Sequence, residues 1–265
     1  MDNILQWNVR GVASAKQDLL KLIETHNFSV IALQETFLGN GVMVKLPGYS
    51  GICRQGHYNH RFHGGVAIYV HSACPFQQIS INSNHQVIAA KVQLTNNTPI
   101  TIASIYLPGR EPISIQSMTS IIQQLPTPFL LLGDFNDHNA WGAEQVDARG
   151  RIINNIMNNL QLNCLNKGSE THESGTTIDL SICSPNLTPI STWTTLISVL
   201  SSDHHPIMIS IIAPDHNNTE TLPRYNYKRQ IGKTTQLMRY GIIYRTSIAS
   251  TIVLPSFQIS IPNSR

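Results

Sequence analysis

The chain of 265 residues is poor in charged residues and in cysteine, and each scarcity excludes a class of protein. Only 12% of the residues are charged while 41% are hydrophobic, so we expect a large folded core rather than a disordered chain. The few cysteines are scattered and form no Cys-x-x-Cys pair, which argues against a zinc site and against a disulfide framework. They are Cys53, Cys74, Cys164 and Cys183.

The sequence also lacks the signals of secretion and of membrane insertion. Residues 1–6 have neither the basic region nor the long apolar run of a signal peptide. The uncharged stretch Thr246–Ser264 is interrupted by serine, threonine and two prolines, so it is a poor membrane span. We therefore expect an intracellular protein with no membrane partner.

The net charge of +3 is distributed unevenly along the chain. Residues 1–215 contain 11 Lys and Arg against 14 Asp and Glu, whereas residues 216–265 contain seven against one. A basic segment beside a mildly acidic domain suggests contact with a polyanion, although a solvated linker is often basic as well. The apolar pattern ends near residue 214. We therefore expect one domain over residues 1–214 and a basic, poorly ordered, linker-like tail over residues 215–265.

Short apolar runs separated by turn residues predict a protein rich in strands, with a few helices of 3.6-residue periodicity. Strands adjacent in sequence alternate with strands joined by helices, which is typical of mixed sheets. Two sheets packed face to face with helices outside would bury all of the runs. The predicted strands are Ile4–Val9, Val30–Gln34, Gly65–Val70, Val87–Leu94, Ile100–Tyr106, Phe129–Leu132, Ile178–Ile182 and Ile207–Ile212. The predicted helices are Ala13–His26, Ile113–Leu125 and Arg149–Leu160.

The run Phe129–Leu132 is the most informative segment, because it leads directly into Gly133-Asp134-Phe135-Asn136. A run of this kind indicates a strand buried on both faces. On an extended backbone, residues two apart point to the same side, so Asp134 and Asn136 would project together. This pair could bind a metal or orient a water and a phosphate, or it could be an ordinary Asp/Asn turn.

Other predicted strands also end in polar residues that could take part in chemistry. Each of them also has an ordinary explanation, as a helix cap, a loop carboxylate, a rim aromatic or a turn former. Their coincidence is informative, because strands of one sheet tend to align their ends and could bring these residues to one rim. The residues are Asn8, Arg10, Glu35, Tyr106, Asp179, Asp203 and His204.

This set of side chains suits the hydrolysis of a phosphodiester. The transition state is anionic, which calls for a hard divalent cation, for which Glu35 and Asn8 are candidate ligands. A carboxylate such as Asp134 could position the attacking water, and His204 could donate to the phosphate oxygens. An acid behind the histidine would fix its tautomer and raise its pKa, a role open to Asp179 or to Asp203.

Taken in sequence order, the motifs resemble those of the endonuclease/exonuclease/phosphatase superfamily. The resemblance extends over about residues 3–212. It is strongest to the apurinic-type endonuclease domain that opens the polyprotein of jockey-like and I-element-like non-LTR retrotransposons. The motifs that carry it are Gln6-x-Asn8-x-x-Gly11, Gln34-Glu35-Thr36, Tyr106-x-Pro108, Gly133-Asp134-Phe135-Asn136, Ile178-Asp179-Leu180 and Ser202-Asp203-His204-x-Pro206.

The resemblance implies a fold, a reaction and a set of partners. The fold is a four-layer α/β sandwich of the DNase I type, with two packed mixed β-sheets and helices outside. The reaction is a Mg²⁺-dependent nick in DNA, with Mn²⁺ able to substitute, which leaves a 3′-hydroxyl that primes reverse transcription. The implied partners are DNA and, through the rest of a polyprotein, the element RNA, with action in the nucleus and a cytoplasmic location otherwise.

Carried over residue by residue, the resemblance assigns roles to the site. Asp134 would position or activate the water, and Asp179 would orient His204, whereas His205 falls at a variable position. The metal residues would be Glu35, Asn8 and Asp203. The substrate-binding residues would be Asn136, Tyr106 and Arg10. The catalytic residues would be Asp134, His204, Asp179, Tyr106, Asn136 and Asp203.

The tail and the charge of the domain refine the expectation. The resemblance continues into a linker-like segment and stops after Arg229, and no Tyr-x-Asp-Asp polymerase signature occurs. We therefore expect a fragment that lacks the reverse transcriptase. Because the domain has few basic residues, we expect weak, salt-sensitive DNA binding. Its candidate phosphate contacts are Arg10, Arg54, Arg61 and Arg110. The alternatives are a cellular abasic-site repair endonuclease and a catalytically dead DNA-binding remnant.

Overall fold

The structure, a computed structural model, describes residues 1–39, 42–56, 63–136, 147–196 and 200–212. One compact unit extends from Met1 to Pro214. The predicted basic tail, residues 215–265, lies outside the described residues. Among the described residues, no helix is long and apolar enough to cross a membrane.

The first of two six-stranded sheets has the order β11-β12-β1-β2-β4-β3. Its central strands β1 and β2 are parallel, and every other neighbouring pair in it is antiparallel. The glycines Gly64 and Gly65 stand just before β4 with positive φ angles, as expected for a turn between strands. The strands are β1 (Asp2–Asn8), β2 (Phe28–Gln34), β3 (Tyr49–Arg54), β4 (Val66–His71), β11 (Ser191–Thr195) and β12 (Ile207–Ile211).

The second sheet has the order β5-β6-β7-β8-β10-β9 and repeats the same plan. Its central pair β7 and β8 is parallel, and its other pairs are antiparallel. Each sheet therefore joins two antiparallel halves along one parallel pair. The strands are β5 (Phe76–Ile79), β6 (Gln86–Gln93), β7 (Pro99–Tyr106), β8 (Phe129–Asp134), β9 (Asn163–Cys164) and β10 (Asp179–Cys183).

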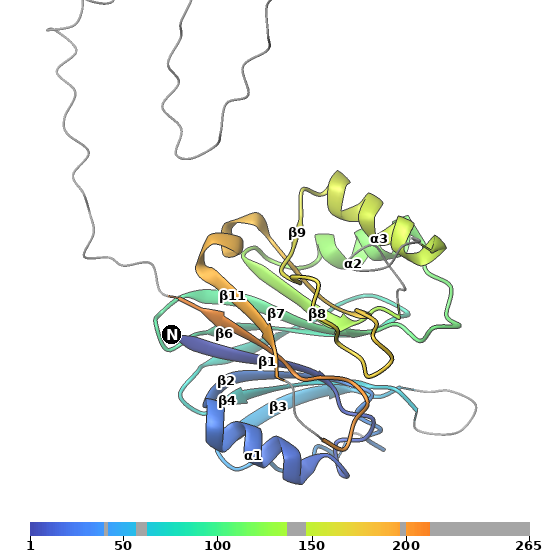
Figure 1. Ribbon diagram of the computed structural model, residues 1–265. Helices are drawn as coiled ribbons and strands as arrows, with labels where there is room; N and C mark the ends of the chain where they lie inside the picture. Colours follow the sequence, from blue (N-terminus) through green and yellow to red (C-terminus); the bar gives the residue numbers. More distant parts are fainter. Residues whose placement is uncertain (40–41, 57–62, 137–146, 197–199, 213–265) are drawn as a thin grey trace, which may run out of the picture. The chain divides into compact units, whose positions relative to one another are not determined.

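The helices cover the outer faces of the two sheets, so the unit has four layers (Figure 1). Helix α1 (Lys16–His26) buries Leu19 and Leu22 on the first sheet, together with Trp7. Helices α2 (Ile115–Gln123) and α3 (Ala148–Asn159) pack on the second sheet. A 3₁₀ helix (Pro185–Ile190) connects β10 to β11. This arrangement confirms the predicted sandwich of two packed mixed sheets with helices outside.

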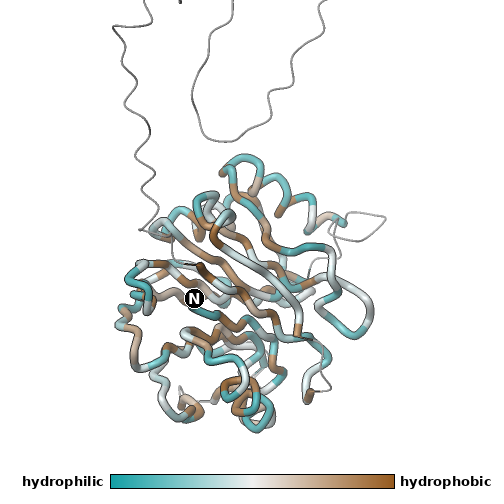
Figure 2. The backbone as a smooth tube through the Cα atoms, turned by 60° about the vertical axis from the view of Figure 1, so that its left-hand side comes forward, coloured by the Kyte–Doolittle hydropathy of each residue, from teal (hydrophilic) through white to brown (hydrophobic). Residues whose placement is uncertain are grey.

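The pattern of β8 follows from its place in the middle of these layers. Leu130 and Leu132 face the core between the two sheets, whereas Leu131 faces the core beneath α2 and α3. Both faces are therefore buried, as the unbroken apolar run predicts. Figure 2 shows hydrophobic stretches along the strands of the unit and hydrophilic residues mainly in the connections.

Two buried glutamines tie the sheets together across the central core. Gln6 of β1 donates to the carbonyl oxygens of Gly133 and Leu180, and its own oxygen accepts from Ser181. Gln34 of β2 donates to the hydroxyl of Ser104 on β7 at 2.9 Å. Buried amides are costly unless they are hydrogen-bonded, so these bonds fix how one sheet lies on the other.

All eight predicted strands and all three predicted helices are present, with boundaries shifted by a few residues at most. The strands that the sequence did not predict are β3, β5, β9 and β11. They are the four edge strands of the two sheets. An edge strand is partly exposed and carries no continuous apolar run, so the pattern that reveals the central strands is absent there.

Candidate active site

The candidate site lies where several strands of both sheets end on one side of the sandwich. The parallel strands β1 and β2 end at Asn8 and Gln34, which are register partners. In the second sheet, Asp134 at the end of β8 is flanked by Tyr106 at the end of β7 and by Asp179 at the start of β10. Because β10 and β12 run antiparallel to their neighbours, their first residues meet the last residues of the other strands.

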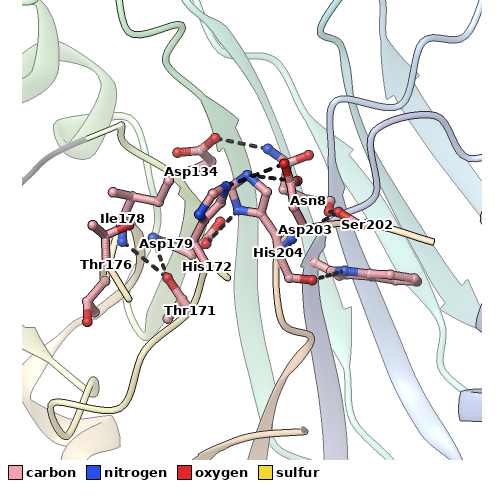
Figure 3. Close-up of polar contacts among 12 residues, drawn as sticks. Asn8, Asp134, Thr171, His172, Thr176, Ile178, Asp179, Ser202, Asp203 and His204 are labelled. Carbon is pink, nitrogen blue, oxygen red and sulfur yellow. Dashed lines mark hydrogen bonds and ion pairs between the residues drawn. The ribbon is translucent and has the colours of Figure 1, made fainter. Parts of the chain in front are cut away.

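Asp134 is buried, and its side chain accepts several hydrogen bonds. Figure 3 shows the one that comes from Asn8. The Asp134 carboxylate accepts from the amide of Asn8 at 2.9 Å, from the amide of Asn136 at 3.0 Å and from the backbone N–H of Asn136 at 2.8 Å. The predicted extended backbone is wrong at Asn136, which has a φ of 46°. The two side chains meet because the chain turns after Asp134, and not because a strand continues.

His204 and Asp179 form a buried pair that joins the two sheets. The Nδ1 atom of His204 lies 2.8 Å from Oδ2 of Asp179. The carbonyl oxygen of His204 accepts from Nε1 of Trp7 at 2.8 Å, and its N–H donates to Ser202. Since Nδ1–H donates to the carboxylate, Nε2 is the ring nitrogen left for other chemistry. Of the two acids considered for this role, Asp179 holds the histidine.

Burial and neighbouring charges alter the acidities of the pair and of Asp134. Burial raises the pKa of Asp134 above the usual range of a carboxyl, and the negative charge of Asp179 acts in the same direction. Burial alone would lower the pKa of His204, but the Asp179 carboxylate outweighs it and the pKa of His204 is raised. The neighbouring carboxylate therefore favours the cationic form of the histidine.

Glu35 lies against Asn8, and Tyr106 is close to Glu35. The Nδ2 atom of Asn8 lies 3.3 Å from Oε1 of Glu35. Burial raises the pKa of the Tyr106 hydroxyl, and the charge of Glu35 and a hydrogen bond to it act in the same direction. Tyr106 is therefore a hydroxyl donor next to the acids.

Three non-glycine residues at the ends of these strands have left-handed backbone conformations. The φ angles are 44° at Arg10, 47° at Glu35 and 46° at Asn136. Such conformations cost free energy and are concentrated at functional sites. A continued strand would place Arg10 on one face with Gln6 and Asn8. Because β1 ends at Asn8, Arg10 lies instead in the connection that follows the strand.

Asp203 lies between two cationic or potentially cationic side chains. Arg10 forms an ion pair with its Oδ2 atom, and Nε2 of His172 lies 3.5 Å from the same oxygen. His172 also packs edge-on against the ring of His204, with ring centroids 4.7 Å apart. His172 is not predicted from the sequence, because a single histidine in a turn gives no signal until the backbone pairs it with His204.

The residues present fit a hard divalent cation. Two groups of acids and histidines have ligand atoms close enough to share an ion, namely Asp134, Asp179 and His204, and His172, Asp203 and His204. Buried oxygen atoms of Asp179 and Asp203 have no hydrogen-bond partner in the described structure. Of the three predicted metal residues, Glu35 and Asn8 contact each other. The third, Asp203, lies beside His172 and His204. Carboxylate oxygens of this kind suit Mg²⁺ or Mn²⁺.

The predicted phosphate contacts outside the centre have different surroundings. Arg54 donates to the carbonyl oxygens of Ser83 at 2.7 Å and Val87 at 3.4 Å, so its guanidinium is bonded to the main chain. Arg110 is exposed in the connection that follows β7, and Arg61 lies outside the described residues. His205, assigned to a variable position, donates its backbone N–H to Thr171.

Comparison with protein families and with curated proteins agrees with this geometry. Residues 100–208 match the family model described as endonuclease-reverse transcriptase. Over 176 residues the chain is 27% identical to the RNA-directed DNA polymerase from mobile element jockey of Drosophila funebris. The aligned region covers 63% of this chain and 18% of that protein. The chain spans between 18% and 24% of the length of the curated relatives that it matches.

Solved structures show the same fold. The endonuclease domain of TRAS1, a telomere-specific non-LTR retrotransposon, matches with a TM-score of 0.67 and 20% identity over 80% of this chain and 98% of that one. An AP endonuclease from Archaeoglobus fulgidus matches with a TM-score of 0.62 and 16% identity over 80% and 99%. The resemblance inferred from the motifs is thus confirmed: the chain carries an endonuclease/exonuclease/phosphatase-type fold and is similar to the endonuclease–reverse transcriptase proteins of jockey-like non-LTR retrotransposons.

Proposed function

We propose that this chain is a Mg²⁺-dependent DNA endonuclease of a non-LTR retrotransposon, which nicks target DNA to prime reverse transcription. The observation that carries the proposal is the buried group of Asp134, Asp179 and His204, with Glu35 and Asn8 beside it at the same strand ends. Charges buried this deeply are expensive for the fold, and their concentration on one rim is typical of a catalytic centre.

The cation would be held by Glu35 and Asn8, with Asp203 nearby. It would supply Lewis-acid stabilisation of the negative charge that develops on the phosphate. The Nδ2 atom of Asn8 faces Glu35 in the structure, and an amide nitrogen does not bind a metal, so Asn8 would offer its Oδ1 atom. Mn²⁺ would substitute for Mg²⁺, because the ligands are oxygens.

The side chains around the phosphate would orient the attacking water and donate hydrogen bonds to the phosphate oxygens. Asp134 would orient the attacking water, and His204, held by Asp179, would donate from Nε2 to a phosphate oxygen. Tyr106 would add a second donor. In the structure both N–H groups of the Asn136 amide are already used, by Asp134 and by the Leu107 carbonyl oxygen. A phosphate contact from Asn136 would therefore replace one of these bonds.

Arg10 would also contact the DNA. Its side chain is about half exposed and is paired with Asp203, so a phosphate would compete with this carboxylate for the guanidinium. Such competition, together with the net negative charge of residues 1–215, predicts weak DNA binding that falls steeply with salt.

The biological setting is proposed from the relatives. The curated relatives that the chain matches are named RNA-directed DNA polymerases of mobile elements, and the chain spans less than a quarter of their length. We infer that this endonuclease acts on DNA in the nucleus. In an intact element it would work beside the element RNA, bound by the rest of the polyprotein.

The test is the nicking of supercoiled plasmid in Mg²⁺ or in EDTA. We expect nicked circles from the wild type in Mg²⁺ and none in EDTA. Asp134→Ala and His204→Ala should each lower the rate by about 10²-fold or more. His205→Ala is the matched control and should retain activity. Metal-dependent nicking absent from folded wild type would instead favour a DNA-binding remnant, and a strong preference for an abasic duplex would favour a repair enzyme.

A further inference from the structure

Arg149 makes an unusual set of contacts next to the candidate site. Its NH1 atom donates to the carbonyl oxygens of Leu107 at 3.1 Å and Phe135 at 3.0 Å. Its NH2 atom donates to Pro108 at 3.0 Å, to Gly109 at 3.2 Å and to Glu111. One partly buried guanidinium therefore gathers five main-chain carbonyl oxygens. Two terminal nitrogens carry four N–H groups, so at least one of these is shared.

These carbonyls belong to two segments that leave the candidate site. Residues 107–111 follow Tyr106 at the end of β7, and Phe135 lies between Asp134 and Asn136 at the end of β8. Arg149 itself is in the first turn of α3, where Asp147 caps the helix by accepting from Gly150 at 2.7 Å. Long helical side chains point back toward the helix start, which brings the guanidinium to these strand ends.

The Leu107 carbonyl oxygen links this cluster to the acids. It accepts both from Arg149 and from the Nδ2 atom of Asn136 at 3.2 Å. Asn136 in turn donates to Asp134, and the backbone N–H of Leu107 donates to the Asp134 carbonyl oxygen at 3.0 Å. The orientation of the Asn136 amide is therefore set by a carbonyl whose own position depends on Arg149.

The connection has a second anchor on its far side. The carboxylate of Glu111 contacts Nδ1 of His85, whose Nε2 lies 3.1 Å from the hydroxyl of Ser117 at the start of α2. This contact holds the end of the segment but does not reach Leu107 or Asn136. Without Arg149, the carbonyls of residues 107–109 and of Phe135 would lose a charged donor while the other end stayed attached.

We propose that Arg149 is a positioning residue of the nuclease, which acts through the Leu107 carbonyl to hold Asn136 against Asp134. The inference rests on the proposed function for its kinetic part. A lysine could not replace the arginine, because one ammonium has three donors at a single point, whereas the planar guanidinium reaches carbonyls on both segments. Arg149 lies outside the sequence motifs that carry the resemblance.

The kinetic test uses Arg149→Met, with Arg151→Met as the matched control. Arg151 is exposed on the same helix, so the control removes the same charge. We expect Arg149→Met to lower kcat for plasmid nicking by about 10- to 100-fold, because displacement of a catalytic group by about 1 Å has an effect of that size. KM should change by less than about threefold, as in the control.

A double-mutant cycle distinguishes positioning from general damage. In an Asn136→Ala background, Arg149→Met should lower kcat by less than about threefold, because the group that it positions is already gone. An equal loss in both backgrounds would overturn the inference. So would a rise in KM alone that Arg151→Met reproduces, since the arginine would then act only as a charge toward DNA. If Arg149→Met does not fold, Arg149→Lys replaces it in the same measurements. We again expect kcat to fall while KM changes by less than about threefold.

A readout without activity keeps the inference separate from the proposed function. Amide hydrogen exchange of peptides covering residues 107–111 and 133–136 should be faster in Arg149→Met than in Arg151→Met. If wild type fails to nick DNA but this exchange difference appears, the proposed function fails and the positioning of the segment stands. If exchange is the same in both variants, the inference fails whatever the activity.

Discussion

The Nδ1 atom of His204 and the Oδ2 atom of Asp179 lie 2.8 Å apart, although the two residues come from opposite sheets of the sandwich. Asp179 begins β10 of the second sheet, and His204 precedes β12 of the first. The pair therefore forms only when the two sheets pack in their native alignment. Its chemistry depends on the core between the sheets as much as on the two residues themselves.

We expect Asp179→Asn to reduce nicking strongly while leaving the fold in place. The asparagine has nearly the same shape but removes the charge that raises the pKa of His204, so kcat should fall by about 10²- to 10⁴-fold. Combined with His204→Ala, the substitution should add little to the loss from His204→Ala alone. Single-turnover nicking measures both effects. Glu173→Gln, an exposed acid in the same region, should be neutral, and a fully additive double mutant would contradict the coupling.

Trp7→Phe should lower both stability and activity. The substitution keeps an aromatic ring in the core but removes the donor to the His204 carbonyl oxygen, at a cost of about 1–3 kcal/mol in the free energy of unfolding. Trp193→Phe is the matched control, because Nε1 of Trp193 donates to the Ser181 hydroxyl at 2.9 Å, away from His204. Urea unfolding should show similar losses for both, whereas only Trp7→Phe should slow nicking. Equal activities would show that this bond does not position the histidine.

Gly133→Ala should be strongly destabilising for a reason that the motif itself does not reveal. A Cβ atom at Gly133 would lie 2.0 Å from the carbonyl oxygen of Ile105, its register partner on β7. The strands would have to separate next to Asp134, which we expect to lower the free energy of unfolding by about 1–3 kcal/mol. Gly109→Ala is the comparison, since its Cβ would meet Asn136 only at ordinary contact distances of 3.5 Å and more. Thermal unfolding with no difference between the two would refute this explanation.

Asp2 predicts a specific response of stability to acid, at a site away from the candidate ligands. Burial would raise the pKa of Asp2, but hydrogen bonds from Ser29 and Thr95 outweigh it and the pKa is lowered. A carboxyl with a lowered pKa in the folded state contributes stability above its unfolded pKa of about 3.9, and loses it as the pH falls through the folded value. Wild type should therefore lose stability below about pH 4 through this group.

The measurement for Asp2 is urea unfolding between pH 3 and pH 7 of wild type and Asp2→Asn. At neutral pH the variant should be less stable by about 1–3 kcal/mol, and the difference should shrink in acid. Glu24→Gln, an exposed acid on α1, should follow the wild-type curve. A difference between wild type and Asp2→Asn that stays constant with pH would contradict the assignment.

Glu35→Gln tests the proposed metal site without relying on DNA. A ligand that binds only the folded protein raises its stability, by about 2.7 kcal/mol at 100 times the dissociation constant. Mg²⁺ or Mn²⁺ should therefore raise the melting temperature of the wild type, and Glu35→Gln should shift this response to about tenfold higher ion concentration or more. Glu170→Gln, an exposed acid, should respond like the wild type. An unchanged response in Glu35→Gln would exclude Glu35 as a ligand.

The sequence alone determined which strands form the centre of the protein and which residues stand at their ends. A short apolar run such as that of β8, preceded by prolines, indicates a strand buried on both faces, because both of its sides must be shielded from water. The edge strands β3, β5, β9 and β11 escaped prediction, because partial exposure removes that constraint. The motif residues at the strand ends were found because polar groups next to a buried run are conspicuous.

Only the tertiary structure decided which of these residues meet, and through which atoms. The packing of two sheets selected Asp179 rather than Asp203 as the partner of the His204 Nδ1 atom. It also added His172 to the site, turned Arg54 toward two carbonyl oxygens, and brought Arg149 to five others. These contacts join residues far apart in the chain, and local sequence preference carries no information about them. They arise because buried polar groups must find partners in whatever strand or loop the packed core places beside them.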